Sequence, residues 1–358
     1  MWEGRRRAIE NRYIYGIITG NESSFNTSGV DNSTPVYTIA DQDLSCVLSD
    51  YGGEAFGALS KEELVRRLLA HQRVVEWVMQ DHTVLPVKFG TLLNSSQEVL
   101  GLLTQGHSGF VDTLAAIQDK VEIEVAATWD TSRVLQEISK EEEVVYAREA
   151  ITHKGQPTMQ EQLKLGQIVK ACMDRRRDSY RERMIDFLKP LSVDVAPNAM
   201  VSDQMVMNVA FLVDRARQQE FDERVNQLDN LFQNEITFRV IGPLPSYSFS
   251  TVEITRLTPQ QVEEARGTLH LGDAISEAEI RNAYRRLAAE EQRNLRLEDK
   301  PAKDQFVIAK LRRASELLLR YCRAQSKVQR GESLFVIDIK RSRSDEVEPA
   351  RFSSSERV

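Results

Sequence analysis

The stretch Val84-Leu85-Pro86-Val87-Lys88-Phe89-Gly90-Thr91, here called the octet, is the part of the sequence around which the fold is predicted. Pro86 fixes its own φ and donates no backbone hydrogen bond, so the octet is expected at the edge of a sheet or at the start of a strand. Gly90 leaves room for a sharp exit or for the close approach of another backbone. Taken alone, the octet fits a buried strand and turn, with Phe89 filling the space between a sheet and the preceding helix. Phe89, Gly90 and Thr91 are therefore interpreted as structural residues, and no ligand is expected there.

The residues that precede the octet predict a small sheet covered by a helix. Short runs of β-branched and aromatic residues predict three strands, over Tyr13–Thr19, Val36–Ala40 and Leu44–Ser49. A capping box of Ser60 and Glu63 then begins a helix. Its expected buried stripe consists of Leu64, Leu68, Leu69, Val75 and Val78. A lone histidine beside such a stripe, His71, is interpreted as a packing residue and not as a ligand.

A second capping box, Ser95 with Glu98, begins a broken helix that follows the octet and ends by Asp119. Residues 1–119 are thus predicted to form an N-terminal α+β domain.

A second domain is predicted over residues 120–250. Val121, Ile123 and Val125 alternate with Glu122 and Glu124, so one strand face is expected to be buried and the two glutamates are expected to face solvent. Long helical stretches, two further strands, another helix and a last strand at Ile236–Ile241 follow in the sequence. The order strand, helices, strand, strand, helix, strand is that of a ferredoxin-like domain.

The last strand runs into a proline-rich exit, Gly242-Pro243-Leu244-Pro245, which is expected to be extended. Tyr247 and Phe249 follow, and both are expected to pack back over the sheet. Gly242, Pro243, Pro245 and Tyr247 are counted with the octet as structural motif residues.

Four blocks in this order resemble the gas vesicle protein F/L family (GvpF/GvpL). They are Tyr13–Ile17, Leu85–Thr91, Val121–Val125 with Trp129-Asp130, and Ile241–Phe249. The resemblance implies an α+β N-terminal domain followed by a modified ferredoxin-like domain, as the residues predict independently. Residues 258–358 lie outside it.

The sequence after Phe249 changes from strand alternation to capped helices, so a cleavable linker is expected between Ser250 and Thr258. Residues 258–330 resemble a J-domain in Leu271-Gly272, Ser276–Leu287 and Ile308–Leu318. The His-Pro-Asp motif of that family is replaced by Gln292-Arg293-Asn294, so Hsp70 is not expected as a partner.

The outer face of the predicted helix carries Arg281, Arg285 and Arg286, which are either a candidate partner surface or a solvated helix face. Residues 331–358 are expected to hold an edge strand and then a disordered tail.

Composition excludes several classes of function. The chain of 358 residues has 47 Lys and Arg against 54 Asp and Glu, which argues against coating nucleic acid or an anionic lipid membrane. No apolar run approaches the roughly 20 residues of a membrane helix. The three cysteines are far apart, and the five histidines form no metal-ligand pair at helical spacing. No phosphate-binding loop or nucleophile elbow occurs, so no catalytic, cofactor or metal site is expected.

The resemblance implies a non-enzymatic gas vesicle accessory protein, either a minor structural component or an assembly factor, located at the gas vesicle within the cytoplasm. Its implied partners are the small hydrophobic shell protein and other gas vesicle accessory proteins. The main alternative is a divergent J-like co-chaperone or adaptor that acts through its C-terminal helices. A weaker alternative is an enzyme whose site is built from residues distant in sequence.

Overall fold

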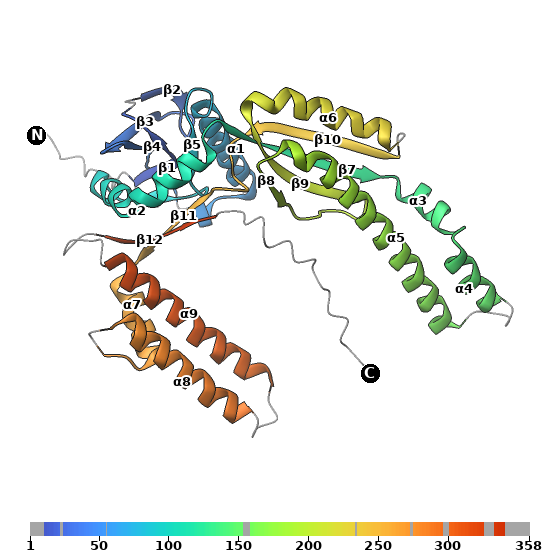
Figure 1. Ribbon diagram of the computed structural model, residues 1–358. Coiled ribbons are helices and arrows are strands. Elements are labelled where there is room, and N and C mark those ends of the chain that lie inside the picture. The colour runs from blue at the N-terminus through green and yellow to red at the C-terminus, as the bar shows by residue number, and fades with distance from the viewer. Residues whose placement is uncertain are drawn as a thin grey trace, which may run out of the picture. The chain divides into compact units, whose positions relative to one another are not determined.

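The computed structural model describes residues 11–21, 24–54, 56–152, 158–232, 235–272, 275–295, 301–325 and 333–340. The chain divides into two compact units. Unit 1 consists of Met1–Ala116 together with Thr251–Ile339, and unit 2 contains Ile117–Ser250. The C-terminal helices therefore belong to the same compact unit as the N-terminal sheet (Figure 1).

Unit 1 is built on an antiparallel sheet with the strand order β2-β3-β4-β1-β5, and β6 also pairs with β1. The strands are β1 (Asn11–Thr19), β2 (Ser24–Ser28), β3 (Pro35–Asp41), β4 (Leu44–Tyr51), β5 (Val84–Pro86) and β6 (Leu92–Leu93). The octet supplies β5 at the end of this order, as Pro86 predicts. Pro86 pairs with Gly16 of β1.

Two helices accompany this sheet, α1 (Lys61–Val78) and α2 (Ser96–Ile117), with a short 3₁₀ turn at Phe56–Ala58. The buried stripe predicted for α1 is wrong in its first half, because Leu64, Leu68 and Leu69 are exposed. The residues of α1 that are buried are Ala70, His71, Val74, Val75 and Val78. The helical period fits both stripes, and the sheet contacts the one formed by the second half of the helix.

Unit 2 is a ferredoxin-like domain, as predicted. Its antiparallel sheet has the order β10-β7-β9-β8, so the first and third strands of the unit are central. The strands are β7 (Lys120–Trp129), β8 (Asp194–Pro197), β9 (Met205–Asp214) and β10 (Ile236–Leu244). The helices are α3 (Thr131–Ile138), α4 (Glu142–Thr152), α5 (Met159–Leu188) and α6 (Gln218–Leu231), with 3₁₀ turns at Lys189–Leu191 and Arg215–Arg217.

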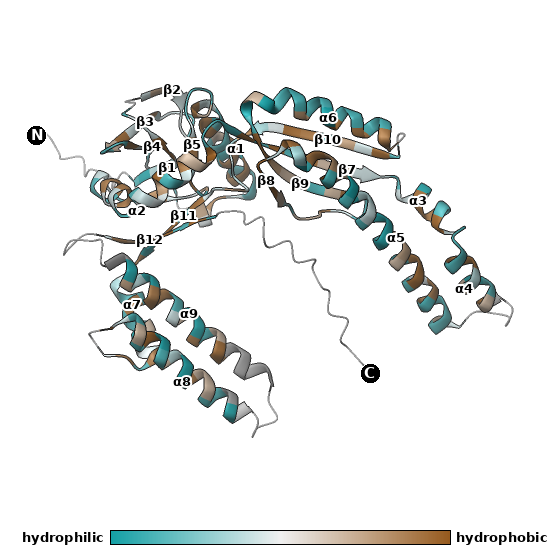
Figure 2. Cartoon of the chain, in the orientation of Figure 1, coloured by the Kyte–Doolittle hydropathy of each residue, from teal (hydrophilic) through white to brown (hydrophobic). Residues whose placement is uncertain are grey.

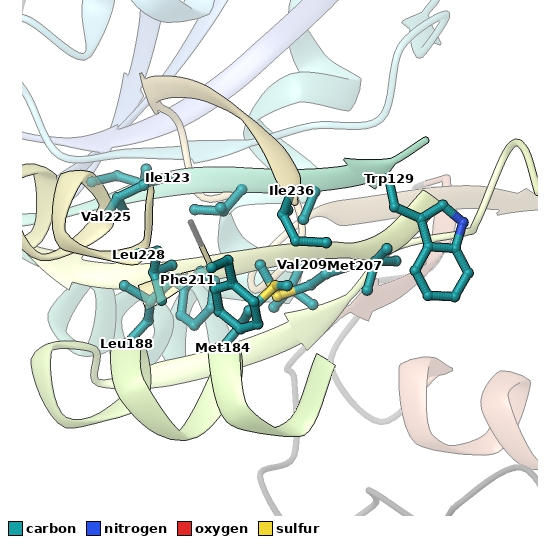
Figure 3. Close-up of a cluster of buried hydrophobic side chains, with 14 of the residues drawn as sticks. Ile123, Trp129, Met184, Leu188, Met207, Val209, Phe211, Val225, Leu228 and Ile236 are labelled. Atoms are coloured by element: carbon teal, nitrogen blue, oxygen red, sulfur yellow. The ribbon is translucent and has the colours of Figure 1, made fainter. Parts of the chain in front are cut away.

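The core of unit 2 lies between one face of this sheet and the helices (Figure 3). Alternate residues of β7 and β9, including Ile123, Val209 and Phe211, meet Met184 of α5 and Leu228 of α6. The period of two along the strands and the helical period of about 3.6 along α5 and α6 place these side chains on facing surfaces. In Figure 2 the side of α6 that faces the viewer is largely hydrophilic, as expected for a helix with one buried stripe.

The chain from Thr251 onward adds a two-stranded sheet and three helices to unit 1. Strand β11 (Val252–Leu257) pairs antiparallel with β12 (Leu334–Ile339), and this pair is here called the ribbon. The helices between the strands are α7 (Pro259–Leu269), α8 (Glu277–Leu295) and α9 (Pro301–Gln325). They share a small core that includes Leu269, Ile280 and Leu318.

The linker expected at 250–258 is thus largely strand β11, because its alternating residues find a partner more than 70 positions later in the sequence. The predicted tail at 341–358 lies outside the described residues. As a whole, the fold class is the predicted one, α+β with an N-terminal α+β part, a ferredoxin-like part and a small helical part.

We predict that Gly90→Val destabilises unit 1 by about 1–3 kcal/mol. The φ of Gly90 is +84°, a conformation that β-branched residues strongly disfavour. The atom nearest to an added Cβ would be Phe56 Cγ at 3.8 Å, so the expected cost is backbone strain and not a clash. Thermal melts of the purified variant should show the loss. Gly90→Asn is the matched control and should cost less, because asparagine tolerates this region. Equal melting of the Gly90→Val variant and the parent would contradict the prediction.

Candidate functional site

The octet is held against β1 by a buried aromatic cluster. The Tyr13 hydroxyl lies 2.9 Å from His71 Nδ1 and accepts a hydrogen bond of 3.1 Å from the Gly90 backbone N–H. The Phe89 ring lies 5.8 Å from the His71 ring and 5.2 Å from the Phe56 ring. Phe89 therefore lies beside α1 and β1 as predicted, although it is half-buried and not fully enclosed.

His71 is a packing residue in this cluster, as the sequence predicts. It is 2% exposed, and its ring stacks on Tyr15 at 5.5 Å. Burial lowers the pKa of His71 to about 4, because a charged imidazolium would lose its hydration there. The neutral ring can accept the Tyr13 hydroxyl proton at Nδ1. The arrangement favours a structural role.

The remaining octet residues extend the attachment to both sides. Two consecutive amides point in opposite directions, so that Val87 N–H donates to Tyr15 C=O at 3.0 Å and Lys88 N–H donates to Val252 C=O at 2.8 Å. Thr91 Oγ1 donates to Lys88 C=O at 2.7 Å, which closes the turn after the strand. The octet is therefore a connector between β1 and β11.

The ribbon is also fixed to α2 by side chains. The Gln105 amide donates from Nε2 to Ser333 C=O and accepts from Phe335 N–H, both at 3.1 Å. Gln105 thus bonds to β12 as a neighbouring strand would. Glu98 accepts from Ser333 Oγ at 2.8 Å and forms an ion pair with Arg256.

Gln105 was not singled out from the sequence. The sequence feature that could have indicated its role is a glutamine on the otherwise apolar stripe of a helix. A side-chain amide buried there needs hydrogen-bond partners.

The sequence predicts that Glu122 faces solvent, and this prediction is wrong, because Glu122 is 0% exposed. Its carboxylate accepts hydrogen bonds from Ser248 N–H at 2.8 Å and from Ser248 Oγ at 2.7 Å. Burial raises the pKa of Glu122 to about 7, and the hydrogen bonds from Ser248 oppose that rise.

The prediction fails because a segment that contains Ser248, more than 120 positions later in the sequence, covers this face of the sheet. Glu124 is half-buried and accepts from Asn198 Nδ2 at 3.1 Å, so the two glutamates have different hydrogen-bond partners. Among the described residues, no cluster of His, Cys, Asp and Glu could hold a metal ion.

The other motif residues of unit 2 lie at the bend that begins this return. Gly242 has a φ of +149°, and a Cβ there would come within 2.9 Å of Glu122 O. Only glycine allows this close approach of two backbones. The Gly242–Pro243 peptide is cis, Pro245 is buried and Tyr247 is half-buried.

Two surfaces remain as candidates for partner contacts. On two successive turns of α1, four apolar side chains are exposed to solvent. They are Leu64 (37%), Val65 (49%), Leu68 (44%) and Leu69 (57%), and they are here called the α1 apolar face. On α8, Arg281, Arg285 and Arg286 are exposed, as predicted for a surface, but Arg281 forms an ion pair with Glu277 at 3.0 Å. No helix in the described residues has the length and apolarity needed to cross a membrane.

The octet and the ribbon are held by structural contacts, and the α1 apolar face and the α8 arginines are exposed. Comparison with known proteins identifies the family. The family model for gas vesicle synthesis protein GvpL/GvpF matches residues 11–251. The chain therefore belongs to the GvpL/GvpF family, and its role is that of a gas vesicle accessory protein associated with other gas vesicle proteins.

Individual relatives agree with this assignment. Gas vesicle protein F of a Streptomyces species is 30% identical over 244 residues, which are 66% of this chain and 98% of that protein. Gas vesicle protein F1 of Halobacterium salinarum is 25% identical over 248 residues, 68% of this chain and 95% of that protein.

Solved structures show the same fold. The crystal structure of GvpF from Anabaena sp. PCC7120 aligns with a TM-score of 0.60 and 23% identity, covering 67% of this chain and 97% of that one. That of GvpF from Microcystis aeruginosa has a TM-score of 0.55 and 25% identity, covering 66% and 98%. These proteins are almost fully covered, so residues 252–358 form an extension beyond the family match.

We predict that Gln105→Ala loosens the ribbon from α2. The substitution leaves the Phe335 N–H and the Ser333 C=O without their buried partner, which costs roughly 1–3 kcal/mol. Limited proteolysis of the full chain should then cut faster between residues 251 and 258 than in the parent, where β11 is paired. Gln97→Ala, at an exposed glutamine of the same helix, is the control. Equal cleavage rates for the two variants would show that Gln105 does not hold the ribbon.

Proposed function

We propose that this protein binds the small hydrophobic shell protein during gas vesicle formation, as a minor structural component or assembly factor acting in the cytoplasm. Support comes from family membership together with the α1 apolar face. Four apolar residues on two successive turns of one exposed helix face are more than the scattered single residues that any surface carries. A hydrophobic partner gains free energy by covering them, at about 25 cal/mol per Å² of apolar surface removed from water.

A double substitution on the α1 apolar face tests this proposal. Leu68→Gln with Leu69→Gln should reduce recovery of co-expressed shell protein with the tagged chain at least tenfold, while the thermal melt stays close to that of the parent. Both leucines are exposed, so their loss removes little core packing. The matched control is Glu62→Gln with Arg66→Gln, two exposed residues of the same helix.

Each outcome of this experiment is informative. Recovery of shell protein by the parent and the control, but not by the leucine variant, supports the proposal. Equal recovery by both variants would assign the contact to another surface. Failure of the parent itself to retain shell protein, and its loss from buoyant vesicles after a salt wash, would refute shell binding.

A second candidate function belongs to the extension. Helices α7, α8 and α9 have a core of their own and border an open groove of about 1040 Å³, lined in part by Leu287, Leu311 and Leu317. These features support the adaptor alternative, in which the extension brings a further protein to the gas vesicle.

We predict that the full chain does not accelerate ATP hydrolysis by the Hsp70 of its host. Gln292-Arg293-Asn294 occupies the place of the His-Pro-Asp motif, and in the structure these residues continue helix α8 to Leu295. A steady-state ATPase assay, with a J-domain protein of the same host as the positive control, measures this. Clear stimulation by the full chain would instead favour the co-chaperone alternative.

A further inference from the structure

A short segment of unit 2 covers the sheet face opposite to the main core. Residues 245–250, here called the lid, follow β10 and include Phe249. Phe249 is 4% exposed and packs on Ala196 of β8 and on Ala210 and Leu212 of β9. These three residues alternate with those of the main core, so they lie on the second face of the sheet.

The lid has its own internal bonds and one attachment to a charged group of the sheet. Ser250 N–H donates to Ser246 C=O at 2.9 Å, and the hydroxyls of these two serines lie within hydrogen-bond distance of each other at 2.5 Å. Ser248 donates two hydrogen bonds to the Glu122 carboxylate, one from its N–H and one from its hydroxyl. A carboxylate with no exposed surface is thereby held by a single residue of the lid.

We propose that the lid opens when Glu122 is ionised and closes when Glu122 is protonated, so that proton binding controls access to the apolar patch beneath it. An ionised carboxylate in a closed, water-free position is costly to bury, even with two hydrogen bonds. Opening the lid returns Glu122 to water. It also exposes Ala196, Ala210 and Leu212.

The charged and titratable groups on the same face do not neutralise Glu122. Glu124 on β7 adds a negative charge that raises the pKa of Glu122 further. Lys120, two residues before Glu122 and on the same face of β7, forms an ion pair of 3.9 Å with Asp214 of β9. Within the described residues, this face of the sheet also carries Asp194 on β8 and Arg239 on β10, and Tyr247 lies in the lid.

The direction of the pH dependence follows from proton linkage. With the lid closed the pKa of Glu122 is about 7, above the ordinary value of 4.5, so the closed state binds the proton more tightly. Closure is therefore most favourable below the ordinary value and is weakened as the pH rises through the interval up to about 7. For one group the closing equilibrium changes by at most about tenfold per pH unit in that interval.

Hydrogen exchange of the full chain between pH 5 and pH 7.5, corrected for the intrinsic rate at each pH, tests the proposal. In the parent, the protection factors of the Ser248, Phe249 and Ser250 amides should decrease as the pH rises to about 7, by an amount that approaches tenfold for each pH unit. In Glu122→Gln, which keeps one acceptor for Ser248 and has no charge, protection should not change with pH. Glu124→Gln is the matched control, two residues further along the same strand, and should show the same decrease of lid protection with pH as the parent.

The amides of β9 provide the reference for global unfolding. A slope confined to the lid in the parent and in Glu124→Gln, and absent in Glu122→Gln, supports the proposal. Equal slopes in the lid and in β9, or no slope in the parent, would overturn it. If Glu122→Gln does not fold, the comparison of lid and β9 amides in the parent and in Glu124→Gln still decides between these outcomes.

Discussion

Unit 1 depends on two successive backbone amides that point in opposite directions. Val87 donates to β1, and Lys88 donates to β11. This is the ordinary alternation of a strand, and it explains why Pro86 is tolerated one position earlier. Its missing donor would point the same way as that of Lys88, away from β1, where no strand of the main sheet lies. The octet can therefore join the N-terminal sheet to the ribbon without disturbing the ladder to β1.

Much of this architecture is readable from the sequence because it is local. Alternation along β7 and the strand and helix order of unit 2 predict the ferredoxin-like sheet, and Ser60 accepts a hydrogen bond from Glu63 N–H at the predicted start of α1. The errors concern long-range partners. Leu64 and Leu68 have the spacing of a core stripe, but the sheet contacts the other stripe of the helix.

The candidate sites were harder to predict than the fold for the same reason. Glu122 has the pattern of a solvent-facing residue until Ser248 covers it, and Gln105 acquires its role only when β12 arrives beside α2. Neither pairing leaves a periodic signal in the sequence. Pro86 and Gly90 could be interpreted correctly because their backbone restrictions are intrinsic to the residue type.

His71 and Glu122 respond to acid in opposite ways. His71 in unit 1 has a lowered pKa of about 4, so the free energy it contributes to folding is present above its ordinary value of 6.5 and is lost as the pH falls towards 4. Glu122 in unit 2 has a raised pKa, so its contribution is lost as the pH rises towards 7. Mild acid thus lowers the contribution of His71 to the stability of unit 1, while protonation of Glu122 removes the cost of burying its charge.

The ribbon also has a consequence for biosynthesis. Lys88 and Glu253, which form an ion pair between the octet and β11, are separated by 165 positions in the chain. Residues 117–250, which form the ferredoxin-like domain, are encoded between them, and β12 comes later still. The ribosome therefore delivers every residue of the ferredoxin-like domain before unit 1 can acquire its last strands. During that interval the outer edge of the octet and the Gln105 side of α2 lack the strands that later cover them, and such unpaired edges are the surfaces on which chaperones act and from which aggregation begins.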